Sequence, residues 1–177
     1  MTGRSGRSGV SVLVCYASRY GSTREIAECI SEELRALGVH VDCIPAGRDA
    51  DPEGYDGVVI GSPLYMGKWL VDARELVSRE RVALGQVPVA VFSVGYSFRN
   101  RSEQALRSGD AALSDVRLFI NPRESAFFPG KVSPSVVSLS DQAILTLAGV
   151  AEGDFRDMEM VRSWARTLPM ILGLEEV

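Results

Sequence analysis

Three loops of this sequence combine glycine with hydroxyl or aromatic side chains, and each follows an apolar run typical of a buried strand. The first, residues 17–23 (ASRYGST), leads into an amphipathic helical pattern. The amides and dipole at a helix N-terminus favour a phosphate group, and glycine lets the backbone approach it closely. The loop has neither the lysine of a Walker loop nor a GxGxxG motif. It therefore suits a monoester phosphate, unless Ser22 and Glu25 serve only as a capping box for the helix.

The second loop, residues 62–69 (SPLYMGKW), places two aromatic side chains and a methionine directly after an apolar run. Exposing Tyr65, Met66 and Trp69 is costly unless they cover an apolar, flat partner. A tricyclic isoalloxazine ring is such a partner. The alternative is that these side chains pack against the helix that follows them.

The third loop, residues 93–100 (SVGYSFRN), again joins glycine to aromatic side chains after a strand. Asn100 and Glu103 have the spacing of a helix cap, which accounts for the polar residues only. Tyr96 and Phe98 are left to line the same ligand site. Three such loops together predict a phosphate-bearing planar heterocycle more strongly than any one of them does.

Short apolar runs alternate along the chain with amphipathic patterns, which predicts an α/β fold with one parallel sheet covered by helices on both faces. In such a sheet, ligands bind beyond the carboxyl ends of the strands, where the strand order reverses. The three loops all lie at that edge. The expected strands are residues 10–16, 39–44, 57–61, 87–94 and 116–120, the last with a continuation at 125–128. The expected helices are residues 22–37, 69–82, 102–114, 135–148 and 158–172.

The composition is that of an ordinary globular protein of 177 residues with a net charge of −4. This charge argues against a nucleic-acid-binding surface. The three cysteines, Cys15, Cys29 and Cys43, are too few and too widely spaced for a disulfide framework. With His40 as the single histidine, they also predict no metal site.

Residues 1–9 are expected to be a disordered leader ahead of one domain at residues 10–177, because they contain no apolar stretch. No apolar run in the sequence is long enough to predict a transmembrane helix. Unpaired cysteines favour a reducing, cytoplasmic location.

The motifs ASRYGST, IGSPLYMGKW and FSVGY together resemble the flavodoxin superfamily, over about residues 10–172. The resemblance implies a flavodoxin-like, doubly wound, five-stranded parallel sheet of order 2-1-3-4-5 that binds one FMN. The first loop departs from the commonest pattern of the family, with Ala17 and Ser18 where threonines are usual. By this resemblance, the FMN phosphate is assigned to Ser18, Arg19, Tyr20, Gly21, Ser22 and Thr23. The isoalloxazine ring is assigned to Pro63, Leu64, Tyr65, Met66, Gly67, Lys68 and Trp69 on one side and to Ser93, Gly95, Tyr96 and Phe98 on the other.

The resemblance looks closest to the subgroup that contains bacterial menaquinone-dependent protoporphyrinogen oxidase. That subgroup has an apolar helix, a Gly-acidic turn and a Trp-bearing last helix after the fifth strand. Residues 135–148, residues 149–154 and Trp164 occupy the corresponding places.

These features favour an FMN-binding redox protein that transfers electrons between a cellular donor and an acceptor, which is either a partner protein or a small molecule. The first alternative is a protoporphyrinogen oxidase-type flavoenzyme that passes electrons to a quinone. The apolar segment at residues 135–148 would then meet a membrane surface, but it carries no basic residue, which argues against peripheral membrane contact.

The second alternative is a non-redox interaction module of the same fold. Receiver modules need acidic residues after the first strand, where this chain has Cys15 and Tyr16. A quinone reductase that takes NAD(P)H directly is disfavoured by the short loop at residues 62–69. The sequence offers no catalytic general acid or base, so if the protein is an enzyme it is an FMN-dependent oxidoreductase in which the cofactor supplies the chemistry. The oligomeric state is left open.

Overall fold

The computed structural model describes residues 9–174, so the predicted leader lies outside the described residues except for Gly9. A parallel sheet of order β2-β1-β3-β5-β6 forms the centre of the molecule, and the short strand β4 pairs with β3 in antiparallel fashion. The predicted fold class and strand order are confirmed, because β5 and β6 are the fourth and fifth parallel strands. The strands are β1 (Ser11–Tyr16), β2 (His40–Pro45), β3 (Gly57–Tyr65), β4 (Lys68–Trp69), β5 (Val89–Val94) and β6 (Glu124–Phe128).

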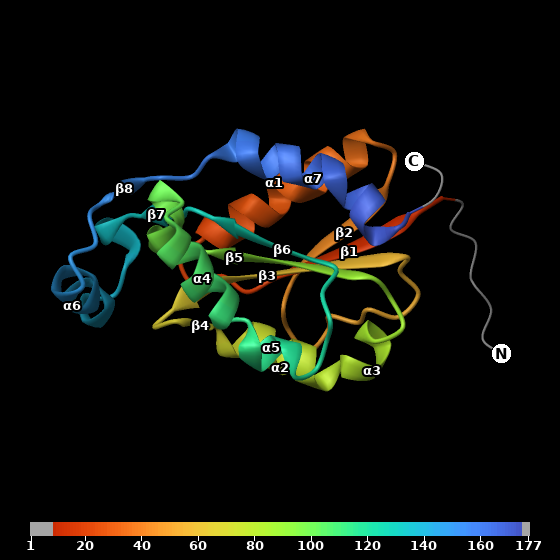
Figure 1. Cartoon of the computed structure of the whole chain (residues 1–177), viewed down its shortest axis with the longest axis horizontal. Helices are drawn as coiled ribbons and strands as arrows, with labels where there is room; N and C mark the ends of the chain where they lie inside the picture. The colour runs from red at the N-terminus through yellow and green to blue at the C-terminus, as the bar shows by residue number, and fades with distance from the viewer. Residues whose placement is uncertain (1–8, 175–177) are drawn as a thin grey trace.

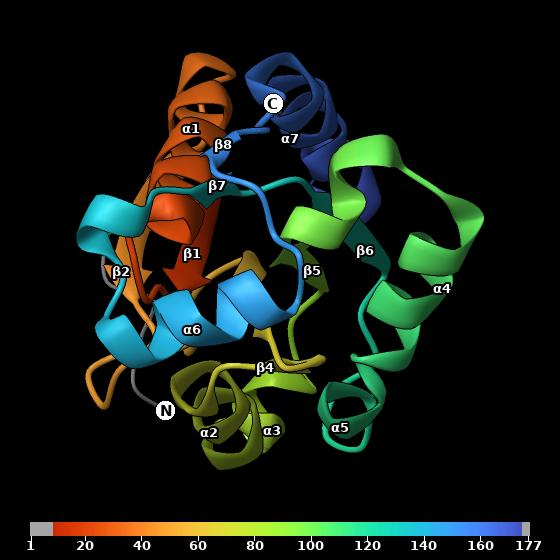
Figure 2. The ribbon, with the colours of Figure 1, turned by 90° about the vertical axis from the view of Figure 1, so that its left-hand side faces the viewer.

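Helices cover both faces of this sheet (Figure 1). Helices α1 (Ser22–Ala36) and α7 (Met158–Leu172) lie side by side on one face. The other face is covered by α2 (Val71–Arg79), α3 (Arg81–Leu84) and α5 (Ser114–Arg117), while α4 (Glu103–Ala111) lies beside β6 (Figure 2).

Two apolar cores lie on the two faces of the sheet, and alternate residues of β1 enter each of them. Val12 and Val14 pack beneath α1 and α7, whereas Leu13 and Cys15 pack beneath α2. This alternation follows from the pleat of a strand that is covered on both sides, and it explains why the run reads as continuously apolar.

The fifth strand is Glu124–Phe128, which confirms the predicted continuation at residues 125–128, whereas the prediction of a strand at residues 116–120 is wrong. Val116 belongs to α5, and its carbonyl accepts a hydrogen bond from the amide of Ile120 at 3.2 Å. Val116 and Ile120 are buried while Leu118 between them is 78% exposed. The apolar spacing is thus that of a helical turn rather than of a strand.

The other boundaries shift by a few residues, as is usual at element ends. The predicted helix at residues 69–82 begins at Val71, because Trp69 pairs with Leu64 in the β3–β4 hairpin. The strand predicted at residues 57–61 continues to Tyr65. The last helix spans Met158–Leu172 as predicted. Among residues 9–174, no helix has the length and apolar character needed to cross a bilayer.

Between β6 and α7 the chain leaves the sheet and forms a separate structure, residues 130–155, which we call the cap. Its two ends pair as the antiparallel strands β7 (Lys131–Val132) and β8 (Gly153–Asp154). The intervening chain contains the short 3-10 helix η2 (Pro134–Val136) and helix α6 (Leu139–Leu147). Figure 2 shows α6 crossing in front of the end of the sheet.

Candidate functional site

The first loop brings the N-terminus of α1 to the carboxyl end of β1. Gly21 precedes the helix with a left-handed backbone (φ 92°), which favours glycine, and its amide donates to the Ser18 hydroxyl at 3.0 Å. The capping box of Ser22 and Glu25 does not form. The Ser22 hydroxyl instead accepts the Lys131 amide at 3.2 Å. The first amides of α1, which have no acceptor within the helix, therefore remain suited to an anion.

The second loop is the end of β3 and the hairpin turn that follows. Met66 (φ 51°) and Gly67 (φ 74°) are its two central residues, and positive φ at both is the pattern of a type I′ turn. Met66 is 79% exposed at the tip of this turn. The chain then returns in β4, where Trp69 is buried and its indole Nε1–H donates to the Ser93 hydroxyl at 2.8 Å.

The third loop follows β5 and places Gly95 and Tyr96 at the same edge. The Tyr96 hydroxyl accepts the Ala151 amide of the cap at 3.2 Å, and its ring meets that of Phe155 edge-on at 5.2 Å. Phe98 turns inward instead, fully buried, with its ring 5.2 Å from that of Phe127.

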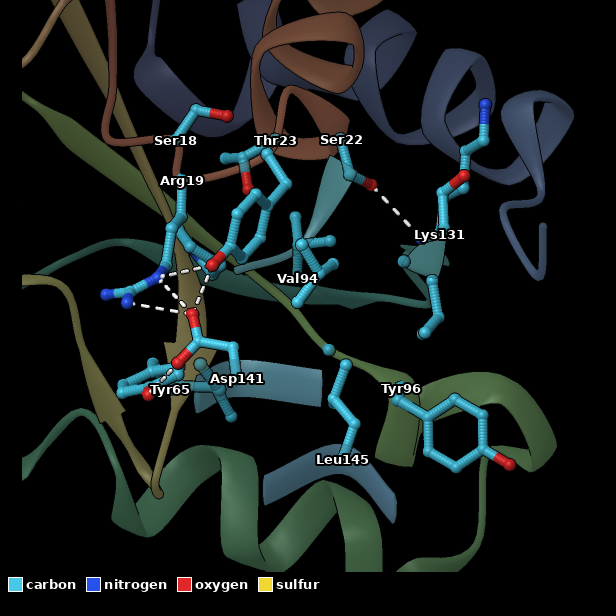
Figure 3. A pocket seen from close by; sticks show the side chains of 18 of the residues that line it. Ser18, Arg19, Ser22, Thr23, Tyr65, Val94, Tyr96, Lys131, Asp141 and Leu145 are labelled. Carbon is cyan, nitrogen blue, oxygen red and sulfur yellow. Dashed lines mark hydrogen bonds and ion pairs between the residues drawn. The ribbon is translucent and has the colours of Figure 1, made fainter. Parts of the chain in front are cut away.

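These loops and the cap enclose a cavity of about 340 Å³ at the carboxyl edge of the sheet (Figure 3). Most of the residues predicted for the site line it: Ser18, Arg19, Tyr20, Ser22, Thr23, Pro63, Leu64, Tyr65, Gly95 and Tyr96. The other predicted residues lie outside its lining: Gly21, Met66, Gly67, Lys68, Trp69, Ser93 and Phe98. Of these, Trp69, Ser93 and Phe98 are buried in the protein, where packing accounts for their side chains.

The cap contributes to this cavity in a way that was not predicted from the sequence. The cap residues that line it are Gly130, Lys131, Val132, Ser133, Val136, Val137, Asp141, Ile144 and Leu145. Ile144 and Leu145 lie on one face of α6, and in Figure 3 Leu145 points into the cavity. The one signal in the sequence that could have indicated this contribution was Asp141, the single acidic residue of an otherwise apolar, Ser-rich helix. Its spacing from Ser138 is that of an ordinary capping contact.

Asp141 is a buried polar residue at the centre of the site, and it is 3% exposed. Its carboxylate accepts the Tyr65 hydroxyl at 2.7 Å and the Arg19 Nε at 2.8 Å, and it also accepts the Tyr20 hydroxyl. The hydrogen bonds from Tyr20 and Tyr65, together with the Arg19 guanidinium, hold the pKa of Asp141 at about 2. The hydrogen bond that Tyr65 donates to Asp141 also raises the pKa of Tyr65.

The arrangement suits a flat ligand with an anionic end. Hydroxyls and helix amides gather at the first loop, while Pro63, Leu64, Val94 and the apolar residues of α6 line the rest of the cavity. The residues that the structure describes contain no group of three or more His, Cys, Asp or Glu side chains that could hold a metal ion.

The chain is similar to proteins of known family. Over 105 residues it is 30% identical to protoporphyrinogen IX dehydrogenase (quinone) from Escherichia coli K12, and the match covers 58% of each chain. Oxidised flavodoxin 1 from Bacillus cereus has a similar fold, with a TM-score of 0.59, 14% identity and coverage of 94% of this chain and 99% of that one. For oxidised flavodoxin 2 from the same organism, the TM-score is 0.54, the identity 20% and the coverage 91% and 99%. Residues 13–157 match the sequence pattern of the flavodoxin domain. The chain therefore belongs to the flavodoxin domain family, whose members bind FMN.

Proposed function

We propose that this protein binds one FMN in the cavity and transfers electrons between a cellular donor and an acceptor. The observation that carries the proposal is the convergence of three loops on one mainly apolar cavity, with the N-terminus of α1 at its rim. A volume of about 340 Å³ lies within the range of small-molecule sites. When bound, FMN would supply one- or two-electron chemistry.

Each part of the cavity has a role in this proposal. The hydroxyls of Ser18 and Thr23 and the first amides of α1 bind the phosphate. The side chains of Pro63, Leu64 and Tyr65 flank one side of the ring, and Gly95 and Tyr96 flank the other. The cap excludes water from the remaining side, because Val137 and Leu145 cover it.

The test is titration of the purified protein with FMN and with riboflavin, which lacks the phosphate. We expect a 1:1 complex with FMN and weaker binding of riboflavin. Gly21→Ala should weaken FMN binding by about tenfold or more, since a side chain at φ 92° strains the phosphate loop, and should leave riboflavin binding unchanged.

Gly38→Ala is the matched control, because Gly38 is also left-handed (φ 87°) with open space around it, but follows the other end of α1. It should cost similar stability and leave both affinities unchanged. Protein that remains colourless and takes up no FMN at micromolar concentration would refute the proposal and favour the non-redox module.

A second candidate is a protoporphyrinogen oxidase-type flavoenzyme. The match to the Escherichia coli enzyme supports it, although the match spans only 58% of that protein. The deciding assay combines the FMN-loaded protein, protoporphyrinogen and a quinone, with and without lipid vesicles. Porphyrin formation that depends on the quinone would favour this candidate, and the absence of porphyrin formation by protein that holds FMN would favour the electron carrier.

A further inference from the structure

The two ends of the cap are bonded to each other and to α1, and we call them its base. Strands β7 and β8 pair with each other, and the Phe155 amide donates to the Gly130 carbonyl at 3.2 Å. Arg156, whose side chain is only 12% exposed, bonds Asp154 through two nitrogens and also pairs with Glu25 of α1. These contacts fix both ends of the cap at one place.

The tip of the cap, helix α6, is held much less firmly. Leu139 and Leu147 are 84% and 89% exposed, and within residues 9–174 neither apolar core includes a residue of the cap. Apart from the apolar contacts over the cavity, α6 is connected to the body of the protein chiefly through Asp141. Figure 3 shows this carboxylate directed away from α6 towards Arg19 and Tyr65.

The contacts of Asp141 join three separate parts of the chain across the cavity. Arg19 and Tyr20 come from the first loop, Tyr65 comes from the end of β3, and the Arg19 guanidinium lies 4.6 Å from the centre of the Tyr65 ring. The charge of the Arg19 guanidinium balances that of the Asp141 carboxylate. These contacts therefore close the cavity without adding a net charge beside the proposed phosphate site. Two glycines with positive φ follow α6: Gly149 (φ 67°) lies directly after the helix, and Gly153 (φ 154°) lies in β8 at the base.

We propose that α6 is a lid and Asp141 its latch, so that the lid must open for the ligand of the cavity to pass in or out. This inference rests on the proposed function in taking that ligand to be FMN. Asp141 then acts as a positioning residue: it holds the lid shut and orients Tyr65 and Arg19, without itself being required for electron transfer.

The lid is tested first without any ligand, by amide hydrogen exchange of the apoprotein. In Asp141→Asn the amides of α6 should exchange about tenfold faster or more than in the wild type, while those of α1 and α7 are unchanged. Glu152→Gln is the control, because it removes an exposed carboxylate from the same cap and should leave exchange as in the wild type. The double variant Tyr20→Phe/Tyr65→Phe removes two donors and keeps the carboxylate, and it should reproduce the effect of Asp141→Asn.

Release of FMN, measured by stopped-flow fluorescence, tests the consequence. Release should be about tenfold faster or more in Asp141→Asn than in the wild type or Glu152→Gln, because opening limits it. If the amides of α6 exchange at the wild-type rate in both Asp141→Asn and the double variant, Asp141 is not a latch. Equal rates of FMN release in the wild type and Asp141→Asn would show that opening of the lid does not limit release. If the wild type binds no FMN, the proposed function fails, and so does the claim that the lid controls passage of FMN. The exchange result still decides whether Asp141 is a latch.

Discussion

The indole of Trp69 joins the hairpin to the core, being 2% exposed with its Nε1–H donated to the buried hydroxyl of Ser93. Trp69→Phe removes this bond and leaves a small cavity, so we expect it to lower the free energy of unfolding by about 2 kcal/mol. FMN affinity should stay within about twofold of the wild type, since neither residue lines the cavity. Urea unfolding and FMN titration measure the two effects.

Ser93→Ala completes a double-mutant cycle with this substitution. Alone it leaves the Trp69 N–H buried without an acceptor, which costs about 1–3 kcal/mol. In Trp69→Phe that donor is absent, and the additional loss from Ser93→Ala should be small. Additive losses would contradict the bond between Trp69 and Ser93, and a drop in FMN affinity at unchanged stability would mean that Trp69 acts at the ligand instead.

The pH dependence of the latch follows from two opposite pKa shifts. The pKa of Asp141 is lowered from 3.8 to about 2, so its contribution to stability is present above about pH 4 and is lost as the pH falls through 2. The pKa of Tyr65 is raised above 10, so its contribution is lost only when the pH rises through that higher value. Between pH 5 and 9 the difference in unfolding free energy between wild type and Asp141→Asn should therefore be constant, and below pH 4 it should shrink. A difference in unfolding free energy that varies between pH 5 and 9 would contradict these two pKa shifts.

The β3–β4 hairpin shows what a turn requires of its residues. Met66 has a positive φ that a side chain disfavours, whereas Asn tolerates it, and Asn-Gly is the preferred pair for a type I′ turn. Met66→Asn should therefore raise the free energy of unfolding by about 0.5–1 kcal/mol. Gly67→Ala, at φ 74°, should lower it by about 1 kcal/mol. Thermal unfolding checks both signs, and equal effects of the two substitutions would exclude this turn geometry.

Short apolar strands and amphipathic helices made most elements of the fold predictable from sequence. The strand predicted at residues 116–120 failed because periodicity in a short apolar run is ambiguous, and Leu118 and Phe119 remain exposed on a helical turn. The fifth strand, Glu124–Phe128, is marked by fewer aliphatic residues.

The loops of the site could be predicted in part, for a different reason. Topology brings the carboxyl ends of parallel strands together, so residues 18–20, 22–23 and 63–65 were correctly expected at one cavity. Whether an aromatic such as Phe98 faces a ligand or a core depends on tertiary packing that its type does not reveal. The partners of Asp141 lie 76 to 122 residues away in sequence, beyond the reach of any local pattern.

At the scale of the whole molecule, the cap is an addition to the sheet and not a part of its cores. Val132 and Gly153 are paired across β7 and β8, so residues 133–152 can be replaced by Asn-Gly to give a short hairpin. Since the described part of the cap contributes no residue to either core, the shortened protein should still unfold in one cooperative transition.

The two tryptophans report on this outcome, one on each face of the sheet. Trp69 lies in the core beneath α2, and Trp164 of α7 packs against Phe92 and Phe128 on the other face. Urea unfolding of single-tryptophan variants should give coincident transitions, with a loss of no more than about 3 kcal/mol relative to the full chain. FMN release from the shortened protein should then be at least as fast as from Asp141→Asn, because the lid is absent. Separate transitions of the two tryptophans would show instead that the cap couples the two faces of the sheet, and slow release would show that the three loops retain the cofactor without it.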